Sequence, residues 1–396
     1  MTEAKRLAIL RVLLKNPRIL KAGIPLNLFL LRYMKKFRIQ DAGGNLIVHS
    51  HLPPLNSRAF GRFIEEHLLK RTEGPSHAQI GLTNACPQRC VYCYNRDRTG
   101  TPLDKSTILR VIDELTKLGV FWLGFTGGEP LLNKDIVEIT AMASRDCAVK
   151  LFTTGCTLTA RLASDLSQAG LFSVSVSLDH WKEEEHDRIR GYKGAFRTAL
   201  KAIDIFKQTG GLQVGVSAVL SKEMIRRNQT EEFLSFLISL GVDEAWLSET
   251  KPSVAAFWNE DLVISEDERL QLVHLQDRYN REGKITVNYL GHFEGKECFG
   301  CNAGRKMIYV DAFGEVSPCV FTPMTFGNVR ERPLGQIVGE MQKYFPSQNR
   351  CLINSNFRLI QKHSRDSAPL SREASLRLLE EVSFGPLAKF FELYYS

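Results

Sequence analysis

Short apolar runs alternate with amphipathic helical patterns along the middle of the chain, and this alternation limits the possible folds more than any other feature. Continuous apolar strands separated by helices are typical of a parallel sheet that is covered on both faces. Six such units predict an α/β fold, a partial (β/α)6 TIM-like barrel whose chemistry collects at the carboxyl ends of the strands. The predicted strands are 78–84, 120–128, 148–155, 171–179, 212–220 and 242–249.

The composition changes on either side of this repeating region, and the change divides the chain into four predicted parts. Residues 1–75 are expected to form a helical N-terminal segment, 76–285 the barrel, 286–361 a small Cys-rich extension, and 362–396 a helical tail. Within the extension, the sequence Asp-Ala-Phe-Gly-Glu at 311–315 predicts the turn of a β-hairpin.

The excess positive charge of the chain lies in its first 38 residues. The net charge is +8. Residues 1–38 hold ten Lys or Arg and one acid, Glu3, whereas the rest of the chain holds 42 basic and 43 acidic residues. This segment is also apolar, but its longest uncharged run, 22–31, has ten residues, about half of the roughly 20 that a membrane-spanning helix needs. Its helices are therefore expected either to pack on the main domain or to lie on an anionic membrane surface.

Two further features of the sequence bear on location and partners. The chain has nine cysteines, an odd number, and it begins without the pattern of a cleavable signal peptide. We therefore expect a cytoplasmic protein with thiolate chemistry, and a peripheral contact at the inner membrane face if residues 1–38 bind lipid. Nucleic-acid binding is not expected, because the basic segment has no interleaved aromatic pattern and no known binding motif.

Three cysteines stand close together just after the first predicted strand. The sequence Cys-Pro-Gln-Arg-Cys-Val-Tyr-Cys contains Cys86, Cys90 and Cys93. A structural zinc site is closed and has four ligands, and no nearby residue obviously supplies the fourth. Thiolates also suit iron–sulfur clusters, in which three cysteines leave one iron free to bind a substrate or cofactor.

The spacing CxxxCxxC, with Tyr92 before the last cysteine and directly after a strand, resembles the radical S-adenosylmethionine (radical SAM) superfamily. The resemblance covers about residues 76–250 and includes companion motifs at the ends of the next strands. It implies that Cys86, Cys90 and Cys93 hold a 4Fe-4S cluster and that S-adenosylmethionine binds its free iron. The other residues implied to bind the cofactor are Tyr92, Gly127, Gly128, Glu129, Thr153, Ser177, Asp179 and Arg190.

The family suggests a role for several of these residues. Gly127, Gly128 and Glu129 belong to the sequence Thr-Gly-Gly-Glu-Pro, whose backbone and carboxylate are implied to hold the methionyl ammonium group. Ser177 and Asp179 resemble the hydroxyl and acid on the ribose side. Arg190 resembles the arginine that pairs with the methionyl carboxylate, a task suited to a guanidinium fork.

A second group of cysteines follows the barrel. Residues 301–319 resemble the opening of the SPASM or Twitch extension found on many radical SAM enzymes. That resemblance implies one auxiliary 4Fe-4S cluster ligated by Cys298, Cys301, Cys319 and Cys351; the alternative is a zinc ribbon. Of the two remaining cysteines, Cys147 is expected to be buried and inert, and Cys156 is either buried or a hydrogen-atom donor facing the cleft.

The resemblance implies an enzyme that cleaves S-adenosylmethionine reductively to a 5′-deoxyadenosyl radical, which abstracts a hydrogen atom from the substrate. A flavodoxin or ferredoxin is the expected electron donor. The expected substrate is a peptide or protein, and the alternative is a lipid or another membrane-held metabolite. A non-catalytic iron–sulfur or zinc sensor is a third hypothesis, but it leaves Arg190 and the Gly-Gly-Glu sequence without a role.

Overall fold

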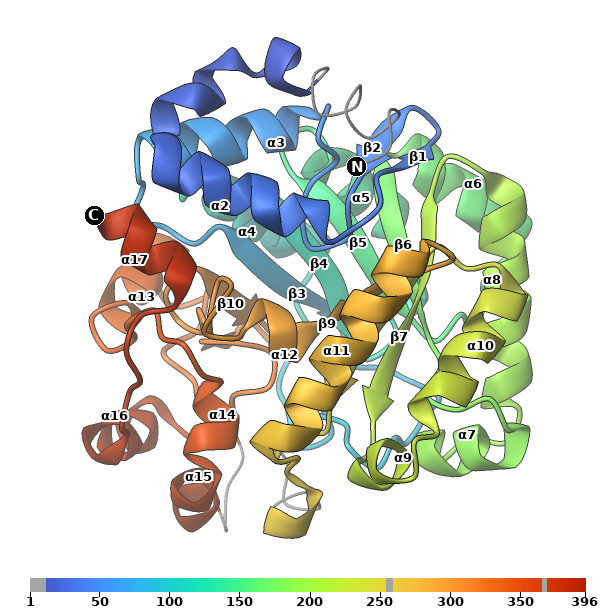
Figure 1. Cartoon of the computed structure of the whole chain (residues 1–396). Coiled ribbons are helices and arrows are strands. Elements are labelled where there is room, and N and C mark those ends of the chain that lie inside the picture. The colour runs from blue at the N-terminus through green and yellow to red at the C-terminus, as the bar shows by residue number, and fades with distance from the viewer. Residues whose placement is uncertain (1–11, 254–258, 365–368) are drawn as a thin grey trace.

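A computed structural model, which describes residues 12–253, 259–364 and 369–396, shows one large sheet that curves into an open barrel (Figure 1). Its nine strands lie in the order β11-β10-β3-β4-β5-β6-β7-β8-β9, and β3 to β8 pair only in parallel. These six strands are the six predicted ones, so the predicted partial (β/α)6 barrel is confirmed. Their bounds are β3 His77–Thr83, β4 Trp122–Gly127, β5 Ala148–Thr153, β6 Leu171–Ser177, β7 Gln213–Leu220 and β8 Glu244–Glu249.

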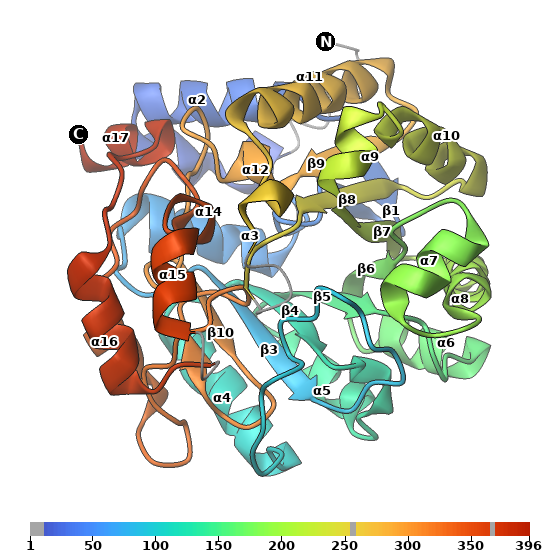
Figure 2. The ribbon, with the colours of Figure 1, turned by 90° about the horizontal axis from the view of Figure 1, so that it is seen from below.

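Helices follow each barrel strand and cover the outside of the sheet. Several of them begin at a side chain that caps the first turn: Asp104, Thr159, Ser221 and Ser265 each accept a hydrogen bond from the backbone three residues on. Figure 2 shows α7 to α10 gathered on one side of the barrel and the C-terminal helices on the other. The barrel helices are α4 Lys105–Lys117, α5 Ile136–Ala143, α6 Ala160–Gln168, α7 Glu183–Arg190, α8 Ala195–Thr209, α9 Lys222–Arg226, α10 Thr230–Leu240 and α11 Glu266–Glu282.

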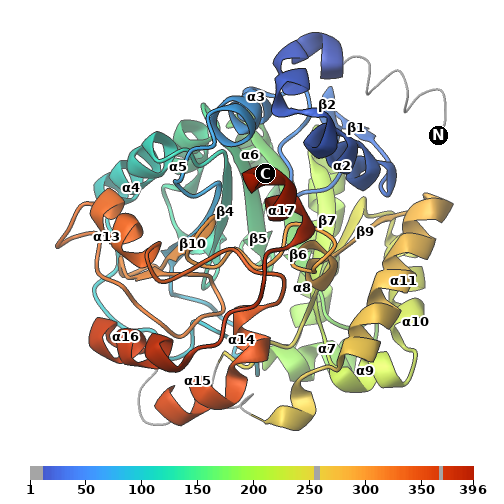
Figure 3. The ribbon, with the colours of Figure 1, turned by 60° about the vertical axis from the view of Figure 1, so that its left-hand side comes forward.

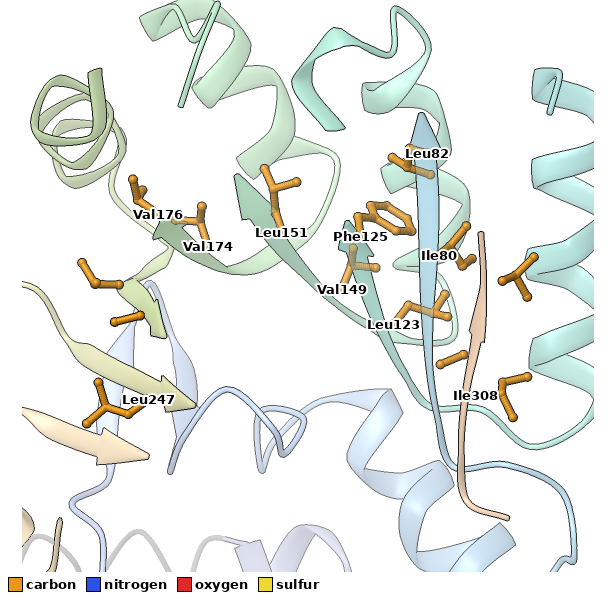
Figure 4. Packing of buried hydrophobic residues seen from close by; sticks show 14 of the residues in the cluster. Ile80, Leu82, Leu123, Phe125, Val149, Leu151, Val174, Val176, Leu247 and Ile308 are labelled. Atoms are coloured by element: carbon orange, nitrogen blue, oxygen red, sulfur yellow. The ribbon is translucent and has the colours of Figure 1, made fainter. Parts of the chain in front are cut away.

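The core lies between the barrel strands and these helices. Ile80, Leu123 and Val149 come from three adjacent strands, and all three are fully buried. Figure 4 shows them in one apolar cluster with Ile308, which comes from a strand late in the chain. The parallel register thus aligns the strand ends, and it also brings the C-terminal extension into the barrel core.

The C-terminal extension adds two strands to the barrel sheet. The predicted hairpin is confirmed, since β10 Met307–Val310 and β11 Val316–Ser317 pair antiparallel around the turn at 311–315. The sequence did not predict that β10 would pair in parallel with β3, where Met307 lies opposite His77. Helix α12 Leu290–Phe293 precedes the hairpin, and β9 Thr286–Tyr289 forms the other edge of the sheet. The helices after the hairpin are α13 Leu334–Met341, α14 Leu352–Ser355, α15 Phe357–Ser364, α16 Arg372–Glu381 and α17 Lys389–Tyr395.

The N-terminal segment packs across the amino end of the barrel. Helix α2, Ile24–Lys35, buries Leu26, Leu30 and Tyr33 in a second apolar cluster, and it lies beside α17 (Figures 1 and 3). This is the packed alternative of the two that the sequence left open, although residues 1–11 lie outside the described part. The remaining elements are η1 Pro17–Ala22, β1 Gln40–Ala42, β2 Asn45–Ile47, α3 Arg58–Arg62 and η2 Phe63–Leu69. No helix of the described residues is both long enough and apolar enough to cross a membrane.

A polar plug closes the amino end of the barrel. The segment His49-Ser50-His51 follows β2 and enters between Lys150 of β5 and Glu244 of β8, and all five side chains are buried. Lys150 Nζ lies 3.7 Å from Glu244 Oε2. The Ser50 backbone N–H donates to the same carboxylate at 3.0 Å. The charges inside this end of the barrel therefore have protein partners.

Candidate active site

The opposite end of the barrel holds a cavity of about 360 Å³. It lies where the barrel strands end, and it extends to Val320 and Phe321, directly after Cys319 of the C-terminal extension. All three cysteines of the CxxxCxxC sequence, Cys86, Cys90 and Cys93, line it. The cavity therefore connects the first cysteine group with the extension that carries the second group.

The loop that carries Cys86, Cys90 and Cys93, called here the cysteine loop, is held on one side by the Gly-Gly sequence. The Gly128 N–H donates to Thr83 O at 2.7 Å, and the Glu129 N–H donates to Ala85 O at 2.8 Å. A Cβ atom at Gly127 would lie 2.4 Å from Thr83 O, and one at Gly128 would lie 2.3 Å from Ala85 O. Only glycine permits this contact, so both glycines fix the backbone that leads into Cys86.

Helix α7 holds the other side of the cysteine loop. Two of its last carbonyls, at Ile189 and Arg190, accept hydrogen bonds from the Val91 and Arg89 N–H groups at 3.1 and 2.9 Å. The helix ends at Gly191 in the left-handed conformation, and a Cβ atom there would lie 2.6 Å from Arg89 O. The helix end and the Gly-Gly sequence together set the position of the three thiols.

Arg190, Asp179 and Tyr92 form a charged cluster beside Cys90. Arg190 Nε lies 2.8 Å from Asp179 Oδ2, and the Tyr92 hydroxyl donates to the same oxygen at 2.6 Å. Arg190 also lines the cavity, and its NH1 donates to Cys90 Sγ at 3.7 Å. Asp179 is fully buried and does not line the cavity. It therefore orients Arg190 and Tyr92, whereas Arg190 is the member that can meet an anionic ligand.

The cysteine loop suits a cluster that needs thiolates. Burial raises the pKa of Cys86 to about 12, and burial also raises the pKa of Cys93. Backbone N–H groups of Gln88 and Asn95 donate to these two sulfurs and oppose that rise. With Arg190 beside Cys90, each of the three sulfurs has a donor that stabilises its negative form. The three sulfurs are soft ligands, and their hydrogen-bond donors partly neutralise the negative charge of the thiolates. The site therefore fits an iron–sulfur cluster.

Glu129, which the sequence implied as a partner of the methionyl ammonium group, is held by residues at the end of β5, and its role toward the cofactor stays a prediction. Its carboxylate is fully buried and lies behind the cavity wall. It accepts hydrogen bonds from the Thr153 hydroxyl at 2.6 Å and from the Thr154 N–H and hydroxyl at 2.6 and 2.5 Å. Burial raises its pKa, and these donors oppose the rise. In this geometry Glu129 ties the end of β4 to the end of β5, while Gly127 and Gly128 are the parts of the motif that line the cavity.

The other predicted site residues divide between two cavities. Tyr92, Thr153 and Ser177 line the cavity of the cysteine loop. Cys156 instead lines a neighbouring groove, formed by the loop after β5, residues of α8 such as Ala202, and Cys86 on the other face of the cysteine loop. The structure therefore does not place Cys156 where it would face the main cavity. Cys147 is buried, as expected, and burial raises its pKa to about 11.

Sequence reasoning missed the part of the cavity that faces the C-terminal extension. Phe152 and Trp246 give it aromatic walls, and Glu249 and Lys251 follow at the end of β8. Lys251 Nζ lies 3.4 Å from Glu249 Oε1 and 3.3 Å from Cys351 Sγ. A signal was available, because Glu249 to Lys251 are polar residues at the carboxyl end of the sixth predicted strand, where barrel chemistry collects.

The structure brings together three of the four cysteines of the second group. Cys301 and Cys351 interact electrostatically with each other, and Cys351 also acts electrostatically on Cys319. Cys298 points elsewhere: its sulfur contacts His292 Nε2 at 3.4 Å, and it lies in the apolar cluster of the N-terminal segment.

Two family models match the chain. The model described as the radical SAM superfamily matches residues 80–234, and the SPASM model, described as an iron–sulfur cluster-binding domain, matches residues 301–363. The chain therefore belongs to the radical SAM superfamily and carries a SPASM-type domain. As a member of that superfamily it is an enzyme, and its cofactors are S-adenosylmethionine, a 4Fe-4S cluster and an auxiliary 4Fe-4S cluster. The iron–sulfur match favours a cluster over the zinc-ribbon alternative.

Named relatives share most of this architecture. The chain is 27% identical over 279 residues to the PqqA peptide cyclase of Granulibacter bethesdensis, a match that covers 67% of this chain and 74% of the relative. It is 28% identical to the mycofactocin maturase MftC of Mycolicibacterium smegmatis, with 61% and 63% covered. Among solved structures, Streptococcus suis SuiB bound to its precursor peptide SuiA matches with a TM-score of 0.58 at 16% identity, covering 85% of this chain and 84% of SuiB. The structural match supports the fold alone.

Proposed function

We propose that this enzyme modifies a peptide or protein by hydrogen-atom abstraction in the cavity between the cysteine loop and the SPASM-type domain. The observation that carries the proposal is the continuity of this cavity, which runs from Cys86 to Phe321. A bound cluster with S-adenosylmethionine supplies the 5′-deoxyadenosyl radical at one end. The other end, with Trp246 and Lys251, is left for the substrate.

The residues of the chain have separate tasks in this proposal. Cys86, Cys90 and Cys93 hold the cluster, and Arg190 binds the cofactor carboxylate while Asp179 orients it. Phe152 and Trp246 pack against the substrate and exclude water from the reacting atoms. The printed names of relatives support a peptide substrate, since a peptide cyclase, a maturase and a SuiB structure with its precursor peptide are among them.

A deuterium transfer experiment tests the substrate class. An extract of cells grown in D2O is separated into a peptide fraction and a lipid fraction, and each is added to the reconstituted, reduced enzyme with unlabelled S-adenosylmethionine in H2O. We expect deuterium in 5′-deoxyadenosine, measured by mass spectrometry, with the peptide fraction only. Enrichment with the lipid fraction alone would establish the alternative substrate. The Cys90→Ala variant is the control and should form no 5′-deoxyadenosine.

We further propose that an acidic electron donor of the flavodoxin or ferredoxin type docks at the cysteine loop. Val91 is 40% exposed there, between the exposed basic residues Arg89 and Arg96. An apolar centre with a basic rim complements an acidic protein partner. Arg89 also lines the cavity, so we expect Arg89→Glu to lower the rate of flavodoxin-supported cleavage about tenfold more than the rate of dithionite-supported cleavage. Equal loss with both reductants would contradict this docking site.

A membrane contact through the N-terminal segment is proposed from its outer face. Leu14, Leu20, Ile24 and Leu28 are between 46% and 76% exposed, although α2 buries its opposite face. The exposed basic residues around them are Lys15, Arg18, Lys21, Arg32 and Lys35. Exposed apolar side chains with basic neighbours fit a surface of anionic lipid.

Vesicle co-sedimentation tests this surface. The wild-type chain should bind vesicles that contain anionic phosphatidylglycerol, and the Ile24→Glu/Leu28→Glu variant should bind at least tenfold less. Leu132→Glu, an exposed leucine on the barrel, is the matched control and should bind as the wild type does. Equal binding of all three proteins would remove the basis for membrane contact.

A further inference from the structure

Backbone pairing, independent of any metal, brings Cys301, Cys319 and Cys351 together. Cys301 and Gln348 exchange both backbone hydrogen bonds, at 2.7 and 3.1 Å, which places the segment leading to Cys351 beside Cys301. The Gly304 N–H donates to Pro318 O at 2.7 Å, which places Cys319 on the same side. These backbone bonds place the three cysteines on adjoining segments of the chain.

Each of these three sulfurs also accepts a backbone N–H from a residue two or three positions further along the chain. The donors are Ala303 for Cys301, Phe321 for Cys319, where the distance is 3.4 Å, and Asn354 for Cys351. The cysteine loop shows the same pattern at Cys86 and Cys93. Such donors stabilise thiolates, as metal ligation requires.

Cys298 lacks this environment. In the described part of the chain, its sulfur has His292 as its recorded hydrogen-bond partner, and its surroundings are Tyr33, Phe299 and other apolar residues packed under α2. The electrostatic influences on Cys298 come from Lys36, Asp277 and Glu297, and not from the other three cysteines. Cys298 thus faces the N-terminal segment, away from the shared centre.

A carboxylate takes the place beside the three cysteines. Lys251 Nζ lies 3.3 Å from Glu294 Oε2 and 3.3 Å from Cys351 Sγ, so this oxygen and this sulfur are at most twice that distance apart. Glu294 acts electrostatically on both Cys301 and Cys319. The residue follows α12 as its C-cap, and its side chain is 17% exposed.

We propose that the auxiliary cluster is held by the thiolates of Cys301, Cys319 and Cys351, that Glu294 is the carboxylate ligand of its fourth iron, and that Cys298 stays a free thiol. The proposal rests on the auxiliary cluster and is independent of the peptide substrate. A carboxylate oxygen is a harder ligand than a thiolate and binds the cluster iron less strongly. The fourth iron therefore exchanges its ligand more readily than the three irons bound by thiolates do. Lys251 lines the cavity and contacts Glu294, so this exchangeable position lies on the substrate side.

Iron counting tests the ligand set. The Cys86→Ala/Cys90→Ala/Cys93→Ala chain, reconstituted anaerobically, holds only the auxiliary cluster and should contain about four irons. In this background Cys298→Ser should keep all of them, as should Cys147→Ser, the matched buried control. Cys301→Ser, Cys319→Ser and Cys351→Ser should each lose most of the iron. Loss of the cluster in Cys298→Ser would overturn the proposal.

Mössbauer spectroscopy tests the carboxylate. In the same background, one of the four irons should differ from the other three, and Glu294→Cys should remove that difference. Glu294→Gln should give a three-iron signal in electron paramagnetic resonance after mild oxidation. Spectra that are unchanged in both variants would overturn the role of Glu294. A parallel set with the cysteine loop intact should still form 5′-deoxyadenosine, which shows that the variants fold and separates this proposal from the proposed function.

Discussion

The two ends of the barrel each hold a buried ion pair, and the pairs differ in what else their charges meet. At the amino end, Lys150 and Glu244 are both fully buried, and the plug segment and Asn288 donate or accept hydrogen bonds with them. At the carboxyl end, Asp179 is fully buried, but Arg190 lies on the cavity wall and also donates to Cys90 Sγ. The first pair is enclosed by protein, and the second has one member directed at a ligand.

The difference shows how one barrel separates stability from chemistry. A buried ion pair adds little net stability, but breaking it leaves a charge without a partner. At the amino end the only consequence is a less stable fold. At the carboxyl end the same loss also changes the surroundings of the cysteine loop, so activity and stability fall together. Matched substitutions at the two ends can test this distinction.

The largest effect is expected for Arg190→Met. The variant loses the guanidinium that donates to Cys90 and that we propose binds the cofactor carboxylate, so 5′-deoxyadenosine formation should fall by about 10²- to 10³-fold. Asp179 keeps the Tyr92 hydroxyl and the Val219 N–H as donors, so the chain should still fold. A variant that forms 5′-deoxyadenosine at the wild-type rate would show that the two pairs do not differ in function.

Lys150→Met makes the matched change at the amino end. It leaves the Glu244 carboxylate buried without its cation, so the free energy of unfolding should fall by about 3 to 5 kcal/mol. The rate of 5′-deoxyadenosine formation per folded molecule should not change. Denaturant unfolding measures the first quantity, and the double variant Lys150→Met/Glu244→Gln should recover most of the loss. A fall in the rate per folded molecule would contradict the separation.

Acid should destabilise the amino end of the barrel through His49 and His77. Burial, with Lys150 nearby, lowers the pKa of His49 to about 3, and burial lowers the pKa of His77 to about 4. The unfolded chain binds protons on these residues below pH 6.5 and the folded chain does not, so stability falls as pH falls from about 6.5 toward 4. At pH 5 the loss is about 2 kcal/mol for each histidine. Thermal unfolding from pH 7 to pH 5 measures it, and a smaller slope is expected for His49→Gln/His77→Gln.

The smallest effects are expected for a pair of single hydrogen bonds. Trp122 Nε1–H donates to Ser50 O at 2.7 Å in the plug, and the Tyr92 hydroxyl donates to Asp179 at 2.6 Å in the cavity. Trp122→Phe and Tyr92→Phe should each lower the free energy of unfolding by about 1 to 2 kcal/mol. Only Tyr92→Phe should also slow 5′-deoxyadenosine formation. Equal rates in the two variants would remove the functional contrast between the ends.

The barrel could be predicted because its signals are local. Each strand is a short apolar run, and each helix repeats its apolar residues with helical spacing, so the order of the six units follows from the sequence. Three features depend on contacts between distant segments and had no local signal. They are the pairing of β10 with β3, the plug around Ser50, and the packing of α2 against α17.

The candidate site was predictable to the extent that its motifs are contiguous. Cys86, Cys90 and Cys93 were found together because four residues or fewer separate each from the next. Glu129 was found by its motif, but its direction depends on Thr153 and Thr154, which lie on another strand. Glu294 had no signal in the sequence, since only folding brings it near Cys301 and Cys351. A contiguous motif in the sequence identifies the residues of a site, whereas the direction of their side chains depends on tertiary contacts.

The position of β10 in the sheet also has a consequence for synthesis on the ribosome. Its contacts join residues about 230 positions apart in the chain, so the edge of β3 stays unpaired until residues 307–310 have emerged. An unpaired strand edge is prone to aggregation. We therefore expect a chain that stops after the barrel to expose the edge of β3 to other chains.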